Sequence, residues 1–205
     1  ITGFARLDGW SVGVIGSDPM SKAGAMDGNA ADKYTHFVDL CDTFNLPLLI
    51  FLDMPGFMLG SHAERIATMR RGARALIASA ECQVPKIEFM VRKSYGVAAD
   101  APNSIGLPDS INLRFGWPSG EWGGIPIEGG VAAAYRREIE AADDPDAHRE
   151  AIEERLLRLR SPFRAAHRGD VVDLIDPRET RSLACRFVNL AQPKLRELAQ
   201  RPKRA

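Results

Sequence analysis

The chain has 205 residues, of which 45% are hydrophobic, so it can bury one core, and we expect a single domain over 1–205. Its 27 basic residues balance its 27 acidic residues, which gives no overall field that would attract nucleic acid. No apolar run approaches the roughly 20 residues that span a bilayer, and no N-terminal signal is visible. We therefore expect a cytoplasmic protein that binds neither nucleic acid nor membrane.

The cysteines and histidines lack the spacing of a redox or metal site. Cys41, Cys82 and Cys185 form no CxxC pair, and their odd number does not favour a disulfide framework. We expect them to be reduced thiols in the core. No two histidines share the spacing of ligands on one helix face, so we predict no metal site.

The first third of the chain predicts a hairpin, a helix and a buried strand. The segments "GFARL" and "WSVGVIG" flank Asp8-Gly9, a dipeptide that tolerates positive φ and suits a two-residue hairpin turn. A helix from Ala30 onward is predicted by an apolar stripe at helical spacing, formed by Tyr34, Phe37, Val38, Cys41 and Phe44. The strand "LLIFL" then follows Pro47.

A second helix and further strands continue the pattern. The helix is expected over 61–80 from the apolar residues Ala63, Ile66, Ala67, Ala73, Leu76, Ile77 and Ala80. The strands "KIEFMV" and "INLRFGWP" come next, and this alternation of strand and helix is typical of an α/β fold with a parallel sheet. The last third reads as helical, and Asp176, Pro177 and Glu179 carry the residue types of a helix start.

Two glycine-containing turns stand at the ends of predicted buried strands, in "FLDMPGF" and "VRKSYGVAAD". Open α/β structures bind ligands at such strand ends, where glycine permits close approach and helix-start amides can hold a developing oxyanion. An Asp-x-Pro-Gly turn also occurs in GTPases, but the chain has no GxxxxGK loop to cradle phosphates. By spacing alone, Gly56 and Gly96 are more simply explained as turn residues.

Taken together, several segments resemble the C-terminal half of a known enzyme subunit, in the order and at the approximate spacing of its family. They are "GFARLDGWSVGVIGSDP", "FVDLCDTFNLPLLIFLDMPGF", "RRGARALIASAECQVPK", "VRKSYG", "GWPSGE" and "SPFRAAHRGDVVDLIDPRETR". The family is the carboxyltransferase β subunit of biotin-dependent acyl-CoA carboxylases of the propionyl-CoA carboxylase type. The resemblance runs almost end to end and implies a crotonase-like (ClpP/crotonase) fold, a spiral of ββα units, with the N-terminal acyl-CoA half absent.

The resemblance implies transfer of a carboxyl group from carboxybiotin to the α-carbon of a propionyl-CoA-like or acetyl-CoA-like substrate. In such enzymes the urea nitrogen of biotin removes the α-proton, so no side-chain base is required. The backbone amides of Val97 and Ala98 would form the oxyanion hole for biotin, and Gly96 would provide the turn. Gly56 and Phe57 would belong to the floor of the biotin site.

Asp100 matches the position where the family places a residue beside the acyl group, so the resemblance implies a role in substrate selection. A helix-start aspartate stabilised by the helix dipole is an equally good explanation of this residue. The implied partners are the N-terminal carboxyltransferase half or subunit, a biotin carboxylase and a biotin carrier. A homo-oligomer is expected, because family active sites form between the N half of one subunit and the C half of another.

Other functions remain open at this stage. The same oxyanion sites would serve a biotin-dependent decarboxylase or transcarboxylase. A non-catalytic assembly module is motivated by Val97 and by Ile66-Ala67, which replace glycines of the family, and we expect the β-branched Val97 to reshape its loop because it disfavours positive φ. A hydratase or isomerase would need an acid or base, for which Glu64 and Asp100 are candidates.

Overall fold

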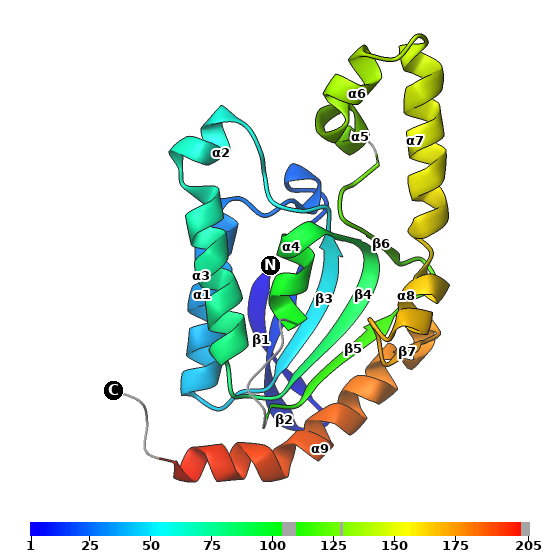
Figure 1. Cartoon of the computed structure of the whole chain (residues 1–205). Helices are drawn as coiled ribbons and strands as arrows, with labels where there is room; N and C mark the ends of the chain where they lie inside the picture. Colours follow the sequence, from blue (N-terminus) through cyan, green and yellow to red (C-terminus); the bar gives the residue numbers. More distant parts are fainter. Residues whose placement is uncertain (104–109, 128, 202–205) are drawn as a thin grey trace.

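The computed structural model describes residues 1–103, 110–127 and 129–201, and these form one seven-stranded sheet with helices on both faces (Figure 1). The strands are β1 (Thr2–Leu7), β2 (Trp10–Gly16), β3 (Leu48–Met54), β4 (Lys86–Tyr95), β5 (Asn112–Gly116), β6 (Glu121–Gly123) and β7 (Asp173–Leu174). Their order is β1-β2-β3-β4-β5-β7, with β6 paired to the second part of β4. Only β1 and β2 are antiparallel, so the predicted parallel α/β sheet is confirmed.

Helices α1 and α3 pack together on one side of the sheet, α9 lies across the other, and α5 to α7 project as an arm (Figure 1). The helices are α1 (Gly28–Thr43), α2 (Ser61–Arg65), α3 (Thr68–Glu81), α4 (Gly96–Asp100), α5 (Gly130–Ala134), α6 (Arg136–Glu140), α7 (Pro145–Leu159), α8 (Pro162–Arg168) and α9 (Thr180–Gln200). Short 3-10 turns are η1 (Lys22–Gly24), η2 (Ala101–Asn103) and η3 (Pro177–Glu179). None of the helices in the described part of the chain has the length and apolarity of a transmembrane segment.

The predicted hairpin is confirmed, and its turn uses the conformation that the sequence favours. Leu7 pairs with Trp10, so Asp8 and Gly9 alone make the connection. Both have positive φ, 50° and 83°, as a two-residue turn of this kind requires.

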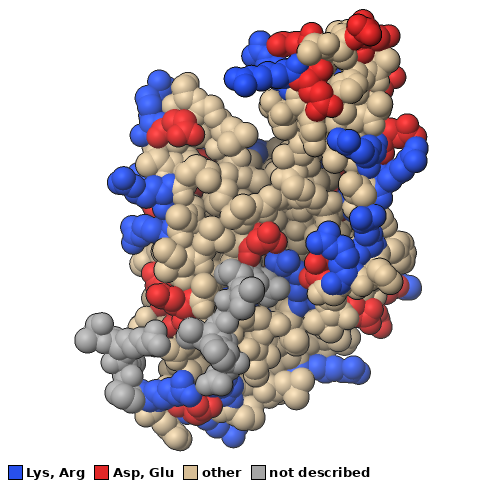
Figure 2. Space-filling view, in the orientation of Figure 1, with Lys and Arg blue, Asp and Glu red and all other residues tan. Residues whose placement is uncertain are grey.

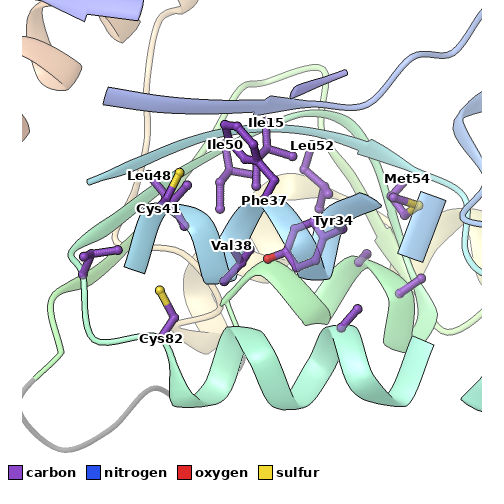
Figure 3. Packing of buried hydrophobic residues seen from close by; sticks show 14 of the residues in the cluster. Ile15, Tyr34, Phe37, Val38, Cys41, Leu48, Ile50, Leu52, Met54 and Cys82 are labelled. Carbon is purple, nitrogen blue, oxygen red and sulfur yellow. The ribbon is translucent and has the colours of Figure 1, made fainter. Parts of the chain in front are cut away.

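The main core lies between the sheet and helices α1 and α3. Figure 3 shows Phe37 and Cys41 near the strand residues, and Tyr34 and Val38 on the side of α1 toward α3. These four side chains confirm the predicted stripe of α1. Phe44 does not belong to it: the helix ends at Thr43, Phe44 is the cap residue, and its side chain is 60% exposed.

The strands alternate between this core and a second one under α9. Leu49, Ile87 and Phe89 face the α9 side, where they pack with residues such as Phe187 and Val188. The intervening β4 residues Lys86 and Glu88 therefore point to the opposite side, and each is only 1% exposed. Two charged side chains thus lie buried on the side of the sheet that α1, α3 and α4 cover.

The helix predicted over 61–80 is wrong as a single element, because the chain breaks between α2 and α3. Ala67 takes a left-handed conformation with φ 54° and ψ 44°, which ends α2 and redirects the chain before α3 begins. The break places the Ile66 carbonyl against the start of α1, 3.2 Å from where a Cβ on Gly28 would lie. The apolar stripe predicted for this helix also included Ile77 wrongly, because Ile77 is 55% exposed.

The last third is helical, as predicted, and the 3-10 turn η3, which leads into α9, starts at Asp176 as expected for the final helix. Asp176 accepts a hydrogen bond from the Arg178 N–H, and Glu179 accepts one from the Asp176 N–H, which completes a capping box. The strands β6 and β7 were not anticipated, since each is too short to leave a pattern in the sequence.

Candidate functional site

The turn after β3, residues 53–57, is here called the β3 turn. The carboxylate of its Asp53 is bound by other residues of the protein. Arg92 donates from Nε to both carboxylate oxygens of Asp53, at 3.3 and 3.1 Å, and from Nη2 at 3.0 Å. The Lys93 N–H donates to the same carboxylate at 3.1 Å. These contacts join β3 to β4 where the register of the two strands shifts, between Leu52 and Met54. Asp53 therefore stabilises an irregular strand pair.

Gly56 and Phe57 complete the β3 turn by packing against the protein's own elements. The Gly56 carbonyl accepts the Met26 N–H at 3.0 Å, and Phe57 pairs with Met26 in a parallel bridge. The Phe57 ring lies on α3, where a Cβ on Gly72 would be 2.4 Å from it. A glycine is needed at position 72 for this close approach.

The turn after β4, residues 95–100, is here called the β4 turn, and it has a different environment. Gly96 has φ 63°, a conformation that glycine adopts readily, and it starts the five-residue helix α4. Val97 lies within this helix and does not have positive φ, so the expectation that it reshapes the family's loop stays a prediction. Its side chain is 56% exposed, whereas Ala98 is fully buried.

The first turn of α4 supplies free backbone donors. A helix leaves its first N–H groups without intrahelical acceptors, and Tyr95, the residue before α4, provides no side-chain cap. Among the described residues, no hydrogen bond from the Val97 or Ala98 N–H is formed outside the helix. Two backbone amides with partial positive charge are thus placed at the end of β4.

A cavity of about 930 Å³ adjoins the β4 turn, and it opens beside the arm, where Figure 2 shows the surface hollowed. Gly96, Val97 and Asp100 line it, so the structure brings these three predicted site residues together. Apolar walls come from β6 and the arm, including Trp122, Ile125, Ile127, Tyr135, Leu156 and Leu159. The arginines that line it are Arg114, Arg160, Arg164 and Arg168, and Figure 2 shows basic side chains gathered along α7 and α8.

Asp100 faces a basic partner in this cavity. It lies at the end of α4, not at a helix start, so the alternative explanation by the helix dipole is wrong. Its carboxylate is 3.7 Å from Nη1 of Arg114, and its side chain is 72% exposed. Arg114 also donates to the Ala99 carbonyl at 3.4 Å and to Glu88 Oε2 at 2.9 Å.

A second polar cluster at the end of β4 was missed in the sequence. The Tyr95 hydroxyl donates to Glu121 Oε2 at 2.9 Å, and Arg160 donates to the same oxygen at 3.4 Å. Burial raises the pKa of Tyr95, and the hydrogen bond to Glu121 acts in the same direction, so the hydroxyl stays protonated. Glu121 closes the segment "GWPSGE", and this position was the only signal that could have pointed to it.

Trp122 forms the cavity wall next to this cluster, and its indole N–H makes no hydrogen bond to the described residues. Its ring fits over two glycines, since a Cβ would lie 2.9 Å from it at Gly116 and 2.4 Å from it at Gly120. Its Nε1 is buried and has no hydrogen-bond partner among the described residues. An unpaired buried donor is costly unless another group accepts from it.

The remaining candidates lie elsewhere. Gly56 and Phe57 are not among the described residues that line the cavity, although a Cβ on Gly56 would be 3.7 Å from the Tyr95 carbonyl. Ala98 lies behind the wall, and Glu64 is exposed on α2. Within the described ranges, His, Cys, Asp and Glu side chains form no group of three that could hold a metal ion.

The mostly parallel sheet with helices on both faces is an α/β fold of the crotonase-like kind, and its candidate site lies at the end of β4. The chain belongs to the carboxyl transferase domain family, whose sequence model matches residues 1–205. The expected family and fold are both confirmed.

Two relatives and one solved structure illustrate the family. The carboxyltransferase subunit of propionyl-CoA carboxylase from Haloferax mediterranei is 43% identical over 183 residues, which cover 89% of this chain and 35% of that protein. Methylmalonyl-CoA decarboxylase subunit alpha from Propionigenium modestum is 37% identical, over 97% of this chain and 38% of its own length. The crystal structure of transcarboxylase 12S, a hexamer assembly with methylmalonyl-coenzyme A bound, has a TM-score of 0.80 and 37% identity, over 100% of this chain and 38% of that chain. The chain thus spans somewhat more than a third of the length of these proteins.

Proposed function

We propose that the chain is the carboxybiotin-side part of an acyl-CoA carboxyltransferase, which transfers a carboxyl group from carboxybiotin to the α-carbon of a short acyl-CoA. The observation that supports this most directly is the cavity at the β4 turn, where Gly96, Val97 and Asp100 lie together. The family's named members include propionyl-CoA carboxylase subunits, and a methylmalonyl-CoA complex is known for the similar transcarboxylase 12S.

The cavity fits the chemistry of biotin, which carries a urea carbonyl on an apolar bicyclic ring. Its walls include apolar side chains from β6 and the arm, and the Val97 N–H lacks a protein acceptor among the described residues. A ligand with an acceptor oxygen and apolar flanks would satisfy such a donor while covering apolar surface. When bound, carboxybiotin would supply the carboxyl group and the basic nitrogen.

The protein's own contribution is electrostatic. The amides of Val97 and Ala98 are the proposed donors to the biotin oxyanion, with Gly96 as the turn that presents them. Preorganised backbone donors need little reorganisation as negative charge develops. The Val97 amide is the nearer donor, because Val97 lines the cavity and Ala98 lies behind it. Gly56 and Phe57 keep a supporting role, since the β3 turn abuts the end of β4.

Asp100 is the proposed substrate selector, and the rest of the active site is proposed to come from partners. Its exposed carboxylate lies on the cavity wall, where it would limit which acyl groups fit. An N-terminal carboxyltransferase half or subunit would hold the acyl-CoA, a biotin carboxylase and a carrier would deliver carboxybiotin, and the protein would work as a homo-oligomer. The hexamer assembly of transcarboxylase 12S supports this arrangement.

We also propose a cytoplasmic location. Cys41, Cys82 and Cys185 are free, and reduced thiols persist in reducing compartments. Burial raises the pKa of Cys41 and of Cys82 to about 12, so both thiols stay protonated and unreactive.

The test is product formation from a carboxylated biotin carrier and a panel of acyl-CoAs, by this chain with and without the N-terminal half. Activity only in the combined sample would support a shared active site. Asp100→Ile should change the relative rates across acyl-CoA lengths, whereas unchanged ratios would remove Asp100 from the acyl site. Inactivity of the combined sample with assembly intact would favour a non-catalytic assembly module.

A biotin-dependent decarboxylase or transcarboxylase is the second candidate. Its support is the similarity to methylmalonyl-CoA decarboxylase subunit alpha and to transcarboxylase 12S. The same donors at Val97 and Ala98 would serve either direction of transfer. Incubating the combined sample with a malonyl-type CoA and uncarboxylated carrier measures the reverse reaction directly.

A further inference from the structure

A chain of alternating charges leads from the core to the cavity wall. Glu88 on β4 lies directly opposite Arg114 on β5 in the parallel register, and their side chains are joined by the 2.9 Å bond to Glu88 Oε2. Arg114 continues to α4, where it contacts both the Ala99 carbonyl and the Asp100 carboxylate. Its own side chain is 10% exposed and lines the cavity.

The Glu88–Arg114 pair is poorly explained by stability alone. Burial raises the pKa of Glu88, and the charges of Arg114 and Lys86 act against that shift. Glu88 Oε1 has no hydrogen-bond partner among the described residues. A buried ion pair with such a defect is often no more stable than two apolar side chains of similar volume.

Lys86 provides an internal contrast on the same face of the same strand. Its Nζ donates to the Ser79 carbonyl at 2.6 Å and to the Ser79 hydroxyl at 3.2 Å. Ser79 in turn donates to the Pro102 carbonyl and accepts from Tyr34. Lys86 is thus satisfied within the core, whereas Arg114 reaches toward the cavity.

We propose that Arg114, anchored by Glu88, is a positioning residue that fixes α4 and sets the orientation of Asp100 in the acyl pocket. Its planar guanidinium presents several donors in fixed directions, so it can hold a strand carboxylate and two groups of α4 at once. Glu88 then acts on the site without touching substrate. This inference rests on the proposed function for its substrate-selection part, but the fixing of α4 can be measured without activity.

The test uses Glu88→Met/Arg114→Met, which removes both charges together and so avoids leaving one buried and unpaired. Hydrogen exchange in the intact chain should become about tenfold faster at the hydrogen-bonded amide that closes α4, the Ala101 N–H that donates to the Val97 carbonyl. This is a change of about 1.4 kcal/mol in local opening, and no such change is expected in α1. Val188→Ala, in the core under α9, is the control for a general loss of stability and should not accelerate exchange in α4 selectively. Unchanged exchange in α4 would overturn the inference.

A double-mutant cycle in the assembled carboxyltransferase then tests whether Arg114 affects substrate selection by orienting Asp100. The paired methionine variant should change the ratio of kcat/KM between short and longer acyl-CoAs by roughly fivefold, corresponding to about 1 kcal/mol. In an Asp100→Asn background the same pair should add little further change. Equal effects in both backgrounds would overturn the role through Asp100.

These outcomes separate failure of the inference from failure of the proposed function. If the unmodified assembly transfers no carboxyl group, the proposed function fails, and exchange in α4 alone decides whether Arg114 fixes that helix. If the assembly is active but neither exchange nor selectivity changes in the paired variant, the inference fails and the function stands.

Discussion

The β3 turn and the β4 turn each place a glycine after a buried strand, but only in the β4 turn does that glycine line one of the described cavities. In the β3 turn, Asp53 is held by Arg92 and Lys93, and the Phe57 ring fills the space beside α3. In the β4 turn, the first amides of α4 have no acceptor among the described residues, and Val97 lines the cavity. What separates a structural turn from a binding turn is therefore what fills it, which a glycine motif does not reveal.

The largest effect should come from removing the donor of the β4 turn with Val97→Pro. Proline lacks an N–H but is tolerated in the first turn of a helix, so the fold should survive. Loss of one oxyanion donor lowers kcat by about 100-fold or more. Val97→Ala keeps the N–H and is the matched control. Carboxyl transfer by the combined sample measures both, and equal rates would exclude Val97 as a donor.

In the β3 turn the corresponding change should affect stability. Phe57→Ala should lower the free energy of unfolding by roughly 2 kcal/mol, less than the about 3–5 kcal/mol of a fully buried Phe because this ring is half-buried. Denaturant unfolding measures it. Val97→Ala, at an exposed side chain, should change the same quantity by less than about 0.5 kcal/mol. A similar loss for both variants would contradict the distinction between the two turns.

The two aspartates sharpen the same contrast. Asp53→Asn should cost about 1–2 kcal/mol, because it weakens charge-assisted bonds to a group that is 8% exposed. Asp100→Asn should cost less than about 0.5 kcal/mol, because its ion pair is long and its side chain is largely exposed. Thermal unfolding of both variants under the same conditions compares them. If Asp100→Asn is the more destabilising, Asp100 is a structural residue.

Local patterns in the sequence predicted the elements that depend on local physics. The Asp8-Gly9 turn, the α1 stripe and the strands that form the sheet follow from side-chain periodicity and turn chemistry. The end of α1 was misjudged at Phe44, because a helical stripe does not show which turn is the last.

The parts that sequence did not predict depend on residues far apart in the chain. Lys86 and Glu88 alternate with apolar residues, a pattern that normally indicates a solvent-facing side, and their burial depends on Ser79 and Arg114. Part of the candidate site was predicted, because the family resemblance assigned Gly96, Val97 and Asp100 to it. Its other members, such as Glu121, are brought in by β6.

The smallest expected change in stability concerns Ala67, between α2 and α3, which takes a left-handed conformation suited to glycine. A left-handed alanine costs about 1–2 kcal/mol, and the greater freedom of glycine in the unfolded chain offsets part of this. Ala67→Gly should therefore stabilise the protein by roughly 0.5 kcal/mol, whereas Ala73→Gly, on an exposed helical position of α3, should destabilise it by about 1 kcal/mol. Chemical denaturation distinguishes the two signs. Destabilisation by both variants would contradict this prediction. It would mean that the left-handed conformation of Ala67 is not a net cost that a glycine at this position would remove.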